Sequence, residues 1–232
     1  EKKIEDELTK EAEKTALSAP KVSQEERRKQ SALAAGKRQP SEAETRYLID
    51  EQLRKVGWEA DTEKLRYSKG TRPEKGRNMA IAEWPTDSHV GNRGYADYAL
   101  FVGTELIATI EAKASHKDIP SVIDYQCKEY SKNIREKDSQ YQIGTWGKYK
   151  VPFTFATNGK PYLEQYKTKS GIWFLDLRQS YNAPRALQGW MSPDGIKELL
   201  AQDTESKNEN LKQMSFDFLT DKDGLNLRPY QL

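Results

Sequence analysis

Three charged side chains interrupt two otherwise apolar segments near the middle of the chain, and their types suit metal-ion chemistry. Asp97 lies within the segment 95–102, and Glu111 and Lys113 end the segment 105–113, where one alanine separates them. A charge inside an apolar segment is costly to bury unless it is paired or binds a metal. Two carboxylates with water ligands suit Mg²⁺, so the pattern predicts a metal-dependent site for phosphodiester cleavage.

Each of these side chains has a task in such a site. Asp97 and Glu111 hold the ion, which makes a bound water more acidic and stabilises charge on a phosphate oxygen. Lys113 shares a strand face with Glu111, because side chains two residues apart point the same way. Its ammonium can orient the water and stabilise negative charge. The alternative is a surface hairpin with a Glu/Lys pair, but the position of the pair after the apolar run 106–110 favours the site.

The register of the two predicted strands decides whether the carboxylates meet. A two-residue turn at Gly103 places Asp97 opposite Ile110, whereas the three-residue turn 103–105 places it opposite Glu111. A shift of one residue turns every side chain to the other face. We therefore predict an odd-length turn, or a bulge near Asp97 that offsets the register.

The elements that position these residues alternate between helices and strands. Ser41 can cap a first helix with Glu44 at the capping-box position, and Gly57 ends it. The order of helix, three strands, helix, two strands and helix predicts an α/β fold, a mixed central β-sheet flanked by helices over about 41–201. The later elements are strands at 79–84, 95–102, 105–113, 151–157 and 171–177, and helices from 117 and from 192 to 200.

The helix after the hairpin carries two further candidates. Gln126 and Tyr130 lie one turn apart, on the face that also holds Ile119 and Cys127. A buried amide needs a hydrogen-bonding partner. In isolation a core tyrosine and an edge glutamine explain both residues, but next to the hairpin they predict support for the site or for a phosphate.

The loop 64–77 is locally basic and contains Tyr67. A basic loop with an aromatic residue suits contact with a nucleic-acid backbone, and an ordinary solvated loop explains the pattern equally well. The candidate DNA contacts are Arg66, Lys69, Arg72, Lys75 and Arg77.

The bulk composition sets broad limits. With 32% charged and 35% hydrophobic residues, the 232-residue chain suits a core with long polar extensions, and a net charge of +2 identifies no partner. One cysteine, Cys127, predicts no internal disulfide and fits the cytoplasm, and two histidines with it make no usual zinc cluster. No apolar run is long enough to span a membrane. We expect residues 1–40 to form a charged helical arm or linker and 202–232 to form a linker.

These motifs resemble a known family. Asp97 and Glu111-Ala112-Lys113 resemble the PD-(D/E)xK nuclease superfamily, with Ala96 at a loose position where the motif name has proline, and Gln126-x-x-x-Tyr130 resembles its RecB-like branch. The chain resembles the N-terminal nuclease domain of type I restriction enzyme R (motor) subunits over about 41–200. The short sequence segments that carry this resemblance are 44–46, 49–50, 57–58, 95–98 and 156–159. Residues 227–231 resemble the entry to a superfamily 2 helicase motor.

The resemblance implies a type I site-specific deoxyribonuclease that cleaves double-stranded DNA. It implies Mg²⁺ held by Asp97 and Glu111, a catalytic Lys113, and support from Gln126 and Tyr130. A carboxylate from the first helix often joins such sites; the candidate is Glu44 and its rival is Glu42.

The resemblance also implies partners and a motor. The partners are the methyltransferase and specificity subunits of the restriction complex. No phosphate-binding Gly-x-x-x-x-Gly-Lys-[Ser/Thr] motif occurs in this chain, so ATP use belongs to a motor outside it, and we expect a fragment that ends where the motor begins. The alternatives are a catalytically silent DNA-binding or assembly domain and a stand-alone repair nuclease.

Overall fold

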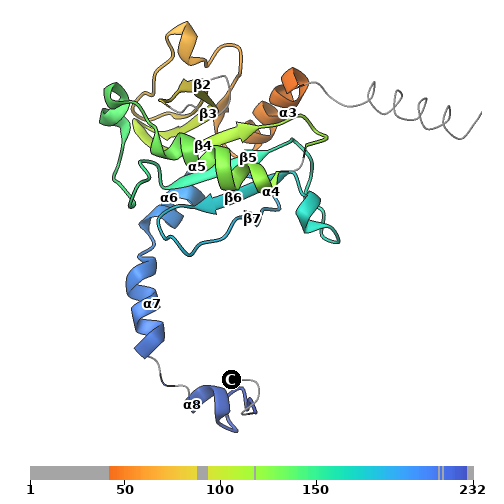
Figure 1. Cartoon of the computed structure of the whole chain (residues 1–232), viewed down its shortest axis with the longest axis vertical. Coiled ribbons are helices and arrows are strands. Elements are labelled where there is room, and N and C mark those ends of the chain that lie inside the picture. Colours follow the sequence, from red (N-terminus) through yellow and green to blue (C-terminus); the bar gives the residue numbers. More distant parts are fainter. Residues whose placement is uncertain (1–41, 88–93, 118, 214, 216, 229–232) are drawn as a thin grey trace, which may run out of the picture.

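The chain folds around one mixed sheet with helices on both faces, as predicted (Figure 1). The computed structural model describes residues 42–87, 94–117, 119–213, 215 and 217–228, so the predicted arm at 1–40 and the Ser41 cap lie outside the described residues. Within these residues the sheet has seven strands, in the order β1 to β7. They are β1 (Glu59–Ala60), β2 (Asn78–Pro85), β3 (Tyr95–Val102), β4 (Glu105–Ala112), β5 (Phe153–Thr157), β6 (Ile172–Asp176) and β7 (Arg185–Ala186).

The helical elements include three that the sequence predicts. The α-helices are α3 (Glu42–Lys55), α4 (Pro120–Val122), α5 (Lys128–Lys132), α6 (Pro193–Ala201), α7 (Thr204–Gln213) and α8 (Asp217–Thr220). Between α4 and α5 lies the π-helical turn η2 (Ile123–Cys127), and the 3₁₀ turns are η1 (Tyr67–Lys69), η3 (Glu136–Tyr141) and η4 (Lys167–Lys169). The first two predicted helices are thus α3 and the segment α4–η2–α5, and the third is α6.

The sheet combines both strand orientations. Strands β2, β3 and β4 are antiparallel, β4 and β5 are parallel, and β5, β6 and β7 are antiparallel. The two-residue strand β1 adds to β2 in parallel. The sequence did not predict β1 or β7, because two residues are too short to show a period.

A bulge sets the register of the β3–β4 hairpin. The turn has two residues, since Val102 pairs with Glu105, and Phe101 pairs with Leu106. The next pair is Leu100 with Ala108, so Ile107 is the extra residue on β4. The predicted bulge is therefore present, the odd-length turn is not used, and the pairing continues with Asp97 opposite Glu111. Bulges of this kind re-aim side chains and are frequent beside active sites.

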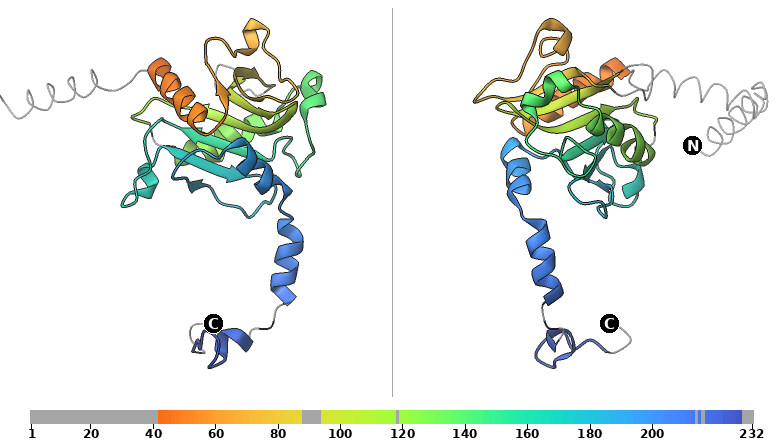
Figure 2. Two further views of the ribbon diagram at one scale, coloured as in Figure 1. Left: turned by 180° about the vertical axis from the view of Figure 1, so that it is seen from behind. Right: turned by 60° about the vertical axis from the view of Figure 1, so that its left-hand side comes forward.

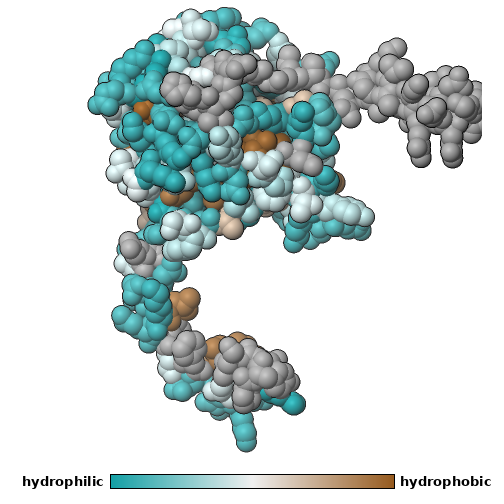
Figure 3. Space-filling view, viewed as in Figure 1, coloured by the Kyte–Doolittle hydropathy of each residue, from teal (hydrophilic) through white to brown (hydrophobic). Residues whose placement is uncertain are grey.

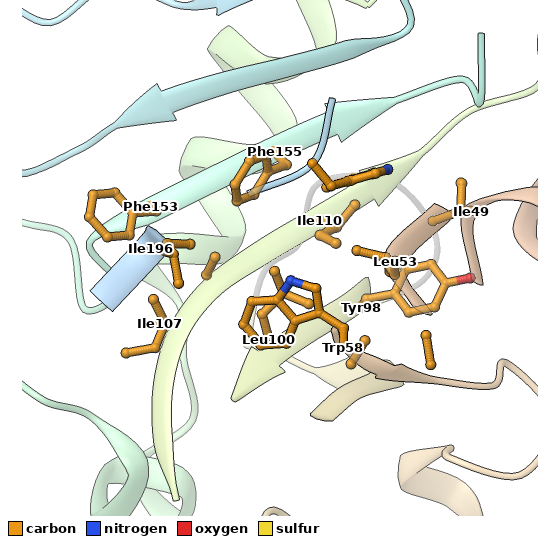
Figure 4. Close-up of a cluster of buried hydrophobic side chains, with 14 of the residues drawn as sticks. Ile49, Leu53, Trp58, Tyr98, Leu100, Ile107, Ile110, Phe153, Phe155 and Ile196 are labelled. Atoms are coloured by element: carbon orange, nitrogen blue, oxygen red, sulfur yellow. The ribbon is translucent and has the colours of Figure 1, made fainter. Parts of the chain in front are cut away.

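Helices α3 and α6 cover one face of the sheet. Ile49 and Leu53 of α3 and Ile196 of α6 are fully buried in one cluster with strand residues. Leu53 lies near Tyr98, and Ile196 lies near Phe153 (Figure 4). Gly57 has φ +99°, which favours glycine, and the chain reverses there as Trp58 N–H donates to Leu53 O over 3.1 Å. The predicted end of the first helix is thereby confirmed.

The segment α4–η2–α5 covers the other face. Ile119, Ile123 and Cys127 pack against Trp173 and Leu175 of β6. The π-helical turn η2 inserts one residue into the helix, and such turns occur often at functional sites. This face of the sheet is also the one toward which Glu111 points, because Glu111 pairs with Ala156, which packs in the same cluster.

Helices α7 and α8 extend away from the sheet (Figures 1 and 2). The polar segment expected to be a linker thus contains a ten-residue helix, α7. Leu211, Phe218 and Leu225 are exposed on this part of the chain, and apolar surface is visible there, whereas the sheet domain is mostly hydrophilic on the same side (Figure 3). No described helix combines the length and the apolar character that crossing a membrane requires.

Candidate active site

Asp97 and Glu111 meet at one end of the sheet, where β3 begins and β4 ends. Both residues are buried: Asp97 is 2% exposed and Glu111 is 5% exposed. The amide of Ala112 donates to Asp97 Oδ2 over 2.7 Å, so the backbone of β4 fixes the carboxylate of β3. The bulge at Ile107 is the cause of this meeting, since without it the two acids would point to opposite faces.

The charge of Asp97 affects the ionisation of Glu111. Burial and the nearby charge of Asp97 raise the pKa of Glu111 to about 8, while Lys113 opposes the rise. Glu111 also lies within hydrogen-bonding reach of Asp97. A pair of carboxylates that resists full ionisation is a place where an added cation gains energy.

Lys113 completes the predicted group. Its amide donates to Thr157 O of β5 over 2.8 Å, which continues the β4–β5 pairing past the end of β4. Its ammonium forms an ion pair with Glu111 Oε1, and the side chain is 25% exposed. The lysine is therefore held beside the acids while solvent, or a substrate, can reach it.

Tyr130 and Gln126 differ in how they relate to this group. Tyr130 of α5 is buried, and its phenol hydrogen-bonds to Glu111. Burial is the main cause that raises the pKa of the phenol, and the negative charge of Glu111 raises it further. Gln126 lies in η2 and is half-buried, and among the described residues its side chain has no hydrogen-bonding partner. The structure thus brings Tyr130, but not Gln126, into contact with the acids.

The first helix contributes an arginine where a carboxylate was the candidate. Glu44 is exposed on α3, and the side chain of Glu42 lies outside the described residues. Arg46, 9% exposed, forms an ion pair with Asp97 Oδ1 and donates from Nη1 to Glu83 Oε1 over 3.3 Å. Asp50, a buried acid of α3, accepts hydrogen bonds from Thr62 and Tyr98 and does not join the site.

Arg46 and Glu83 are the residues of the site that sequence reasoning missed. A signal existed for Arg46, because the spacing of Arg46, Ile49 and Leu53 is that of one helix face. Glu83 lies beside Asp97, since Ala82 pairs with Tyr98 and Trp84 with Ala96. Its φ of +53° is the left-handed conformation, which is rare for a residue other than glycine and which no sequence pattern marked.

The arginines of the basic loop have partners within the protein. Arg66 pairs with Glu83, and Arg77 pairs with Glu59 and Glu74. The guanidinium of Arg72 lies 3.6 Å from the ring centroid of Tyr67. Lys69 and Lys75, the other two candidates, are exposed. The loop and the acids are linked through Arg66, Glu83 and Arg46.

The donor set fits a magnesium ion. Asp97 and Glu111 present carboxylate oxygens to one another at the end of two strands, and Mg²⁺ commonly takes one or two carboxylates with water and substrate phosphate. In the part of the chain that the structure describes, no group of three or more His, Cys, Asp or Glu side chains is gathered. Asp97 and Glu111 are the pair that could hold such an ion, with Glu111 deprotonated.

Comparisons with known proteins agree on one family. The family model described as "Type I restriction enzyme EcoKI endonuclease subunit second domain" matches residues 59–200, a range that includes Asp97, Glu111 and Lys113. The type I restriction enzyme EcoKI endonuclease subunit of Escherichia coli (strain K12) is 42% identical over 193 residues, which cover 73% of this chain and 16% of that protein. No solved structure matches the chain.

Proposed function

The chain belongs to the family of type I restriction enzyme endonuclease subunits, and from this membership we propose that it is the Mg²⁺-dependent DNA-cleaving domain of such a subunit. The observation that carries the proposal is the meeting of Asp97, Glu111 and Lys113 at one end of the sheet. Two buried acids and a lysine suit the hydrolysis of a phosphodiester. The chain spans 16% of the length of its curated relative, so the activity of the whole protein is part of the proposal.

The protein residues divide the work of hydrolysis. When bound, Mg²⁺ supplies positive charge that stabilises the phosphate in the transition state and makes a water molecule more acidic. Asp97 is held in one orientation by the Ala112 amide. Glu111 would hold the ion in its deprotonated form, and Tyr130 keeps the carboxylate in place by a hydrogen bond. Lys113, partly exposed beside Glu111, orients the attacking water and stabilises charge on the phosphate.

The remaining parts of the proposal concern the assembly. DNA is the substrate, and the subunit works with the methyltransferase and specificity subunits in the cytoplasm. ATP-driven translocation belongs to a motor outside these residues. The candidate DNA contacts of the basic loop stay Arg66, Lys69, Arg72, Lys75 and Arg77, of which the two lysines are exposed. Gln126 stays a predicted supporting residue because a bound phosphate could provide the partner that its amide needs.

The test replaces the acids in the full-length subunit. Asp97→Asn and Glu111→Gln keep the shape of each side chain and remove its charge. In the assembled complex with ATP and Mg²⁺, we expect DNA cleavage to fall by about 10²-fold or more, while ATP-driven translocation continues. The matched control is Glu198→Gln, an exposed glutamate of α6, which should leave both activities unchanged.

The outcomes separate the alternatives. Normal cleavage by both variants would mean that the domain is catalytically silent and that DNA is cut elsewhere in the complex. Cleavage by the wild-type subunit without its partner subunits or ATP would favour a stand-alone repair nuclease. Loss of cleavage together with loss of translocation would indicate a structural defect and count against the assigned roles.

A further inference from the structure

Arg46 lies between two carboxylates at the candidate active site. Its Nη2 forms an ion pair with Asp97 Oδ1, and its Nη1 donates to Glu83 Oε1 over 3.3 Å. Arg66 reaches the same oxygen of Glu83 from the basic loop. The order of charges is therefore Asp97, Arg46, Glu83 and Arg66, running from the metal-binding acid to the surface of the domain.

Two of the hydrogen-bond donors of Asp97, the Ala112 amide and Arg46, differ in their freedom to move. Oδ2 accepts from the backbone amide of Ala112, which belongs to the last residue of β4 and is fixed by the pairing of that strand. Oδ1 accepts from the end of a long side chain. A cation that binds Asp97 competes with both donors, and the guanidinium of Arg46 is the one that a side-chain rotation can remove.

Glu83 provides the place to which the guanidinium can move. Its carboxylate already accepts a hydrogen bond from Nη1 of Arg46, so the guanidinium needs only a short displacement to pair with Glu83 instead of Asp97. Its backbone has φ +53° although it lies within β2. Such a conformation is unfavourable for glutamate and persists where the surroundings require it. Here the strained backbone directs a carboxylate at Arg46, and the ion pair with Arg66 holds that carboxylate in position.

We propose that Arg46 is the resident counter-ion of Asp97 in the metal-free site, and that Glu83 takes over its guanidinium when a divalent cation binds Asp97. Arg46 and Glu83 are then positioning residues that act through Asp97. The inference rests on the proposed function, since it assumes that Asp97 binds a metal ion. It predicts that the two residues have opposite effects on metal affinity, because one competes with the ion and the other removes the competitor.

The experiment measures Mg²⁺ binding to the full-length subunit without DNA, by calorimetry and by the shift of the melting temperature with Mg²⁺. Arg46→Gln destabilises the metal-free state more than the metal-bound state, so the half-saturating Mg²⁺ concentration should fall, by at least about fivefold. Glu83→Gln removes the negative charge that takes up the guanidinium of Arg46, so that concentration should rise by a similar factor. The double variant should behave like Arg46→Gln, because Glu83 acts only through Arg46.

The double variant excludes an indirect effect of Arg66. If Glu83→Gln weakened binding only because Arg66 lost its partner, the weakening would persist in the double variant and overturn the inference. Arg54→Lys is the matched control on α3, since Arg54 donates to Ala60 O over 2.6 Å, away from the acids. It should leave Mg²⁺ binding unchanged. Should Arg46→Gln fail to fold, Glu83→Gln alone still tests the inference, because it should weaken Mg²⁺ binding and unchanged or tighter binding would overturn it.

The outcomes also separate this inference from the proposed function. Unchanged or weaker Mg²⁺ binding by Arg46→Gln would overturn the counter-ion role, because a purely structural arginine stabilises both states equally. In that case Mg²⁺ binding that is present in the wild type and lost in Asp97→Asn would leave the proposed function intact. A wild-type subunit without measurable Mg²⁺ binding would overturn both.

Discussion

The arginines of the basic loop and Arg46 of α3 carry the same charge in different surroundings. Arg77 pairs with Glu59 on the surface, with 36% and 43% of the two side chains exposed. Arg46 pairs with Asp97, with 11% and 3% exposed. Water screens an exposed pair and leaves it a small contribution to stability, whereas breaking a buried pair costs about 3–5 kcal/mol because one charge is left unpaired.

This difference shows how to weigh charge in a sequence. The loop 64–77 is conspicuous because its basic residues are close together, yet its arginines contact Glu59, Glu74, Glu83 and Tyr67 within the protein. Arg46 is inconspicuous in a helix rich in charge, yet it lies against the candidate metal site. Isolated charge on an apolar face is therefore the stronger sign of chemistry.

The largest contrast should come from comparing Lys113 with the loop. Lys113→Gln removes the cation beside Glu111 and should lower the cleavage rate by about 10²–10³-fold, with DNA affinity nearly unchanged. The double variant Arg72→Gln/Arg77→Gln removes two charges from the loop and should change the rate by less than about threefold. Both are measured as single-turnover cleavage by the assembled complex. A larger loss from the loop variant would reverse the comparison.

Substitutions of Tyr130 and Gln126 test which residues of the α4–η2–α5 segment belong to the site. Tyr130→Phe removes the hydrogen bond to Glu111 and should lower the cleavage rate by about tenfold, the usual cost of one hydrogen bond to a charged group. Gln126→Ala should lower it by less than about threefold, because no described residue bonds to the amide. The same single-turnover assay applies. Equal losses would mean that Gln126 gains a partner in the DNA complex.

Glu111 should make the metal-free protein less stable as pH rises. The folded protein raises the pKa of Glu111 to about 8, above the ordinary value near 4.5, so the folded state binds the proton more tightly than the unfolded state. The resulting stabilisation is complete below about pH 4.5 and is lost as pH rises through about 8. In the presence of a chelator, the melting temperature of the wild type should therefore fall relative to that of Glu111→Gln as pH rises over this range. Parallel curves for the wild type and the variant would show that Glu111 titrates normally.

The smallest effect should come from the exposed lysines of the loop. Lys69→Gln/Lys75→Gln should weaken DNA binding by no more than a few fold at moderate salt and lower the slope of log affinity against log salt by up to about 2, roughly 0.9 for each phosphate contact. The measurement is a salt titration of DNA binding by the full-length subunit. An unchanged slope would exclude both lysines as phosphate contacts, and the loop would then be a solvated surface.

The sequence by itself determined the longer elements of the sheet domain and the acids of the candidate site. Gly57 ends the first helix because its positive φ suits glycine, and the apolar segments around Asp97 and Glu111 form adjacent strands. These features depend on neighbours along the chain, so periodicity and turn residues reveal them. The need for Asp97 and Glu111 to share a face also followed from the alternation of side chains.

Only the tertiary structure decided how the register is offset and which cation meets Asp97. Ile107 occupies the bulge, and an isoleucine suits a regular strand equally well, so its type gives no sign. The contact of Arg46 with Asp97 joins residues 51 positions apart, and the left-handed conformation of Glu83 is imposed by the elements around it. Such features arise from packing between distant segments, whose energies depend on the whole fold and leave no local pattern in the sequence.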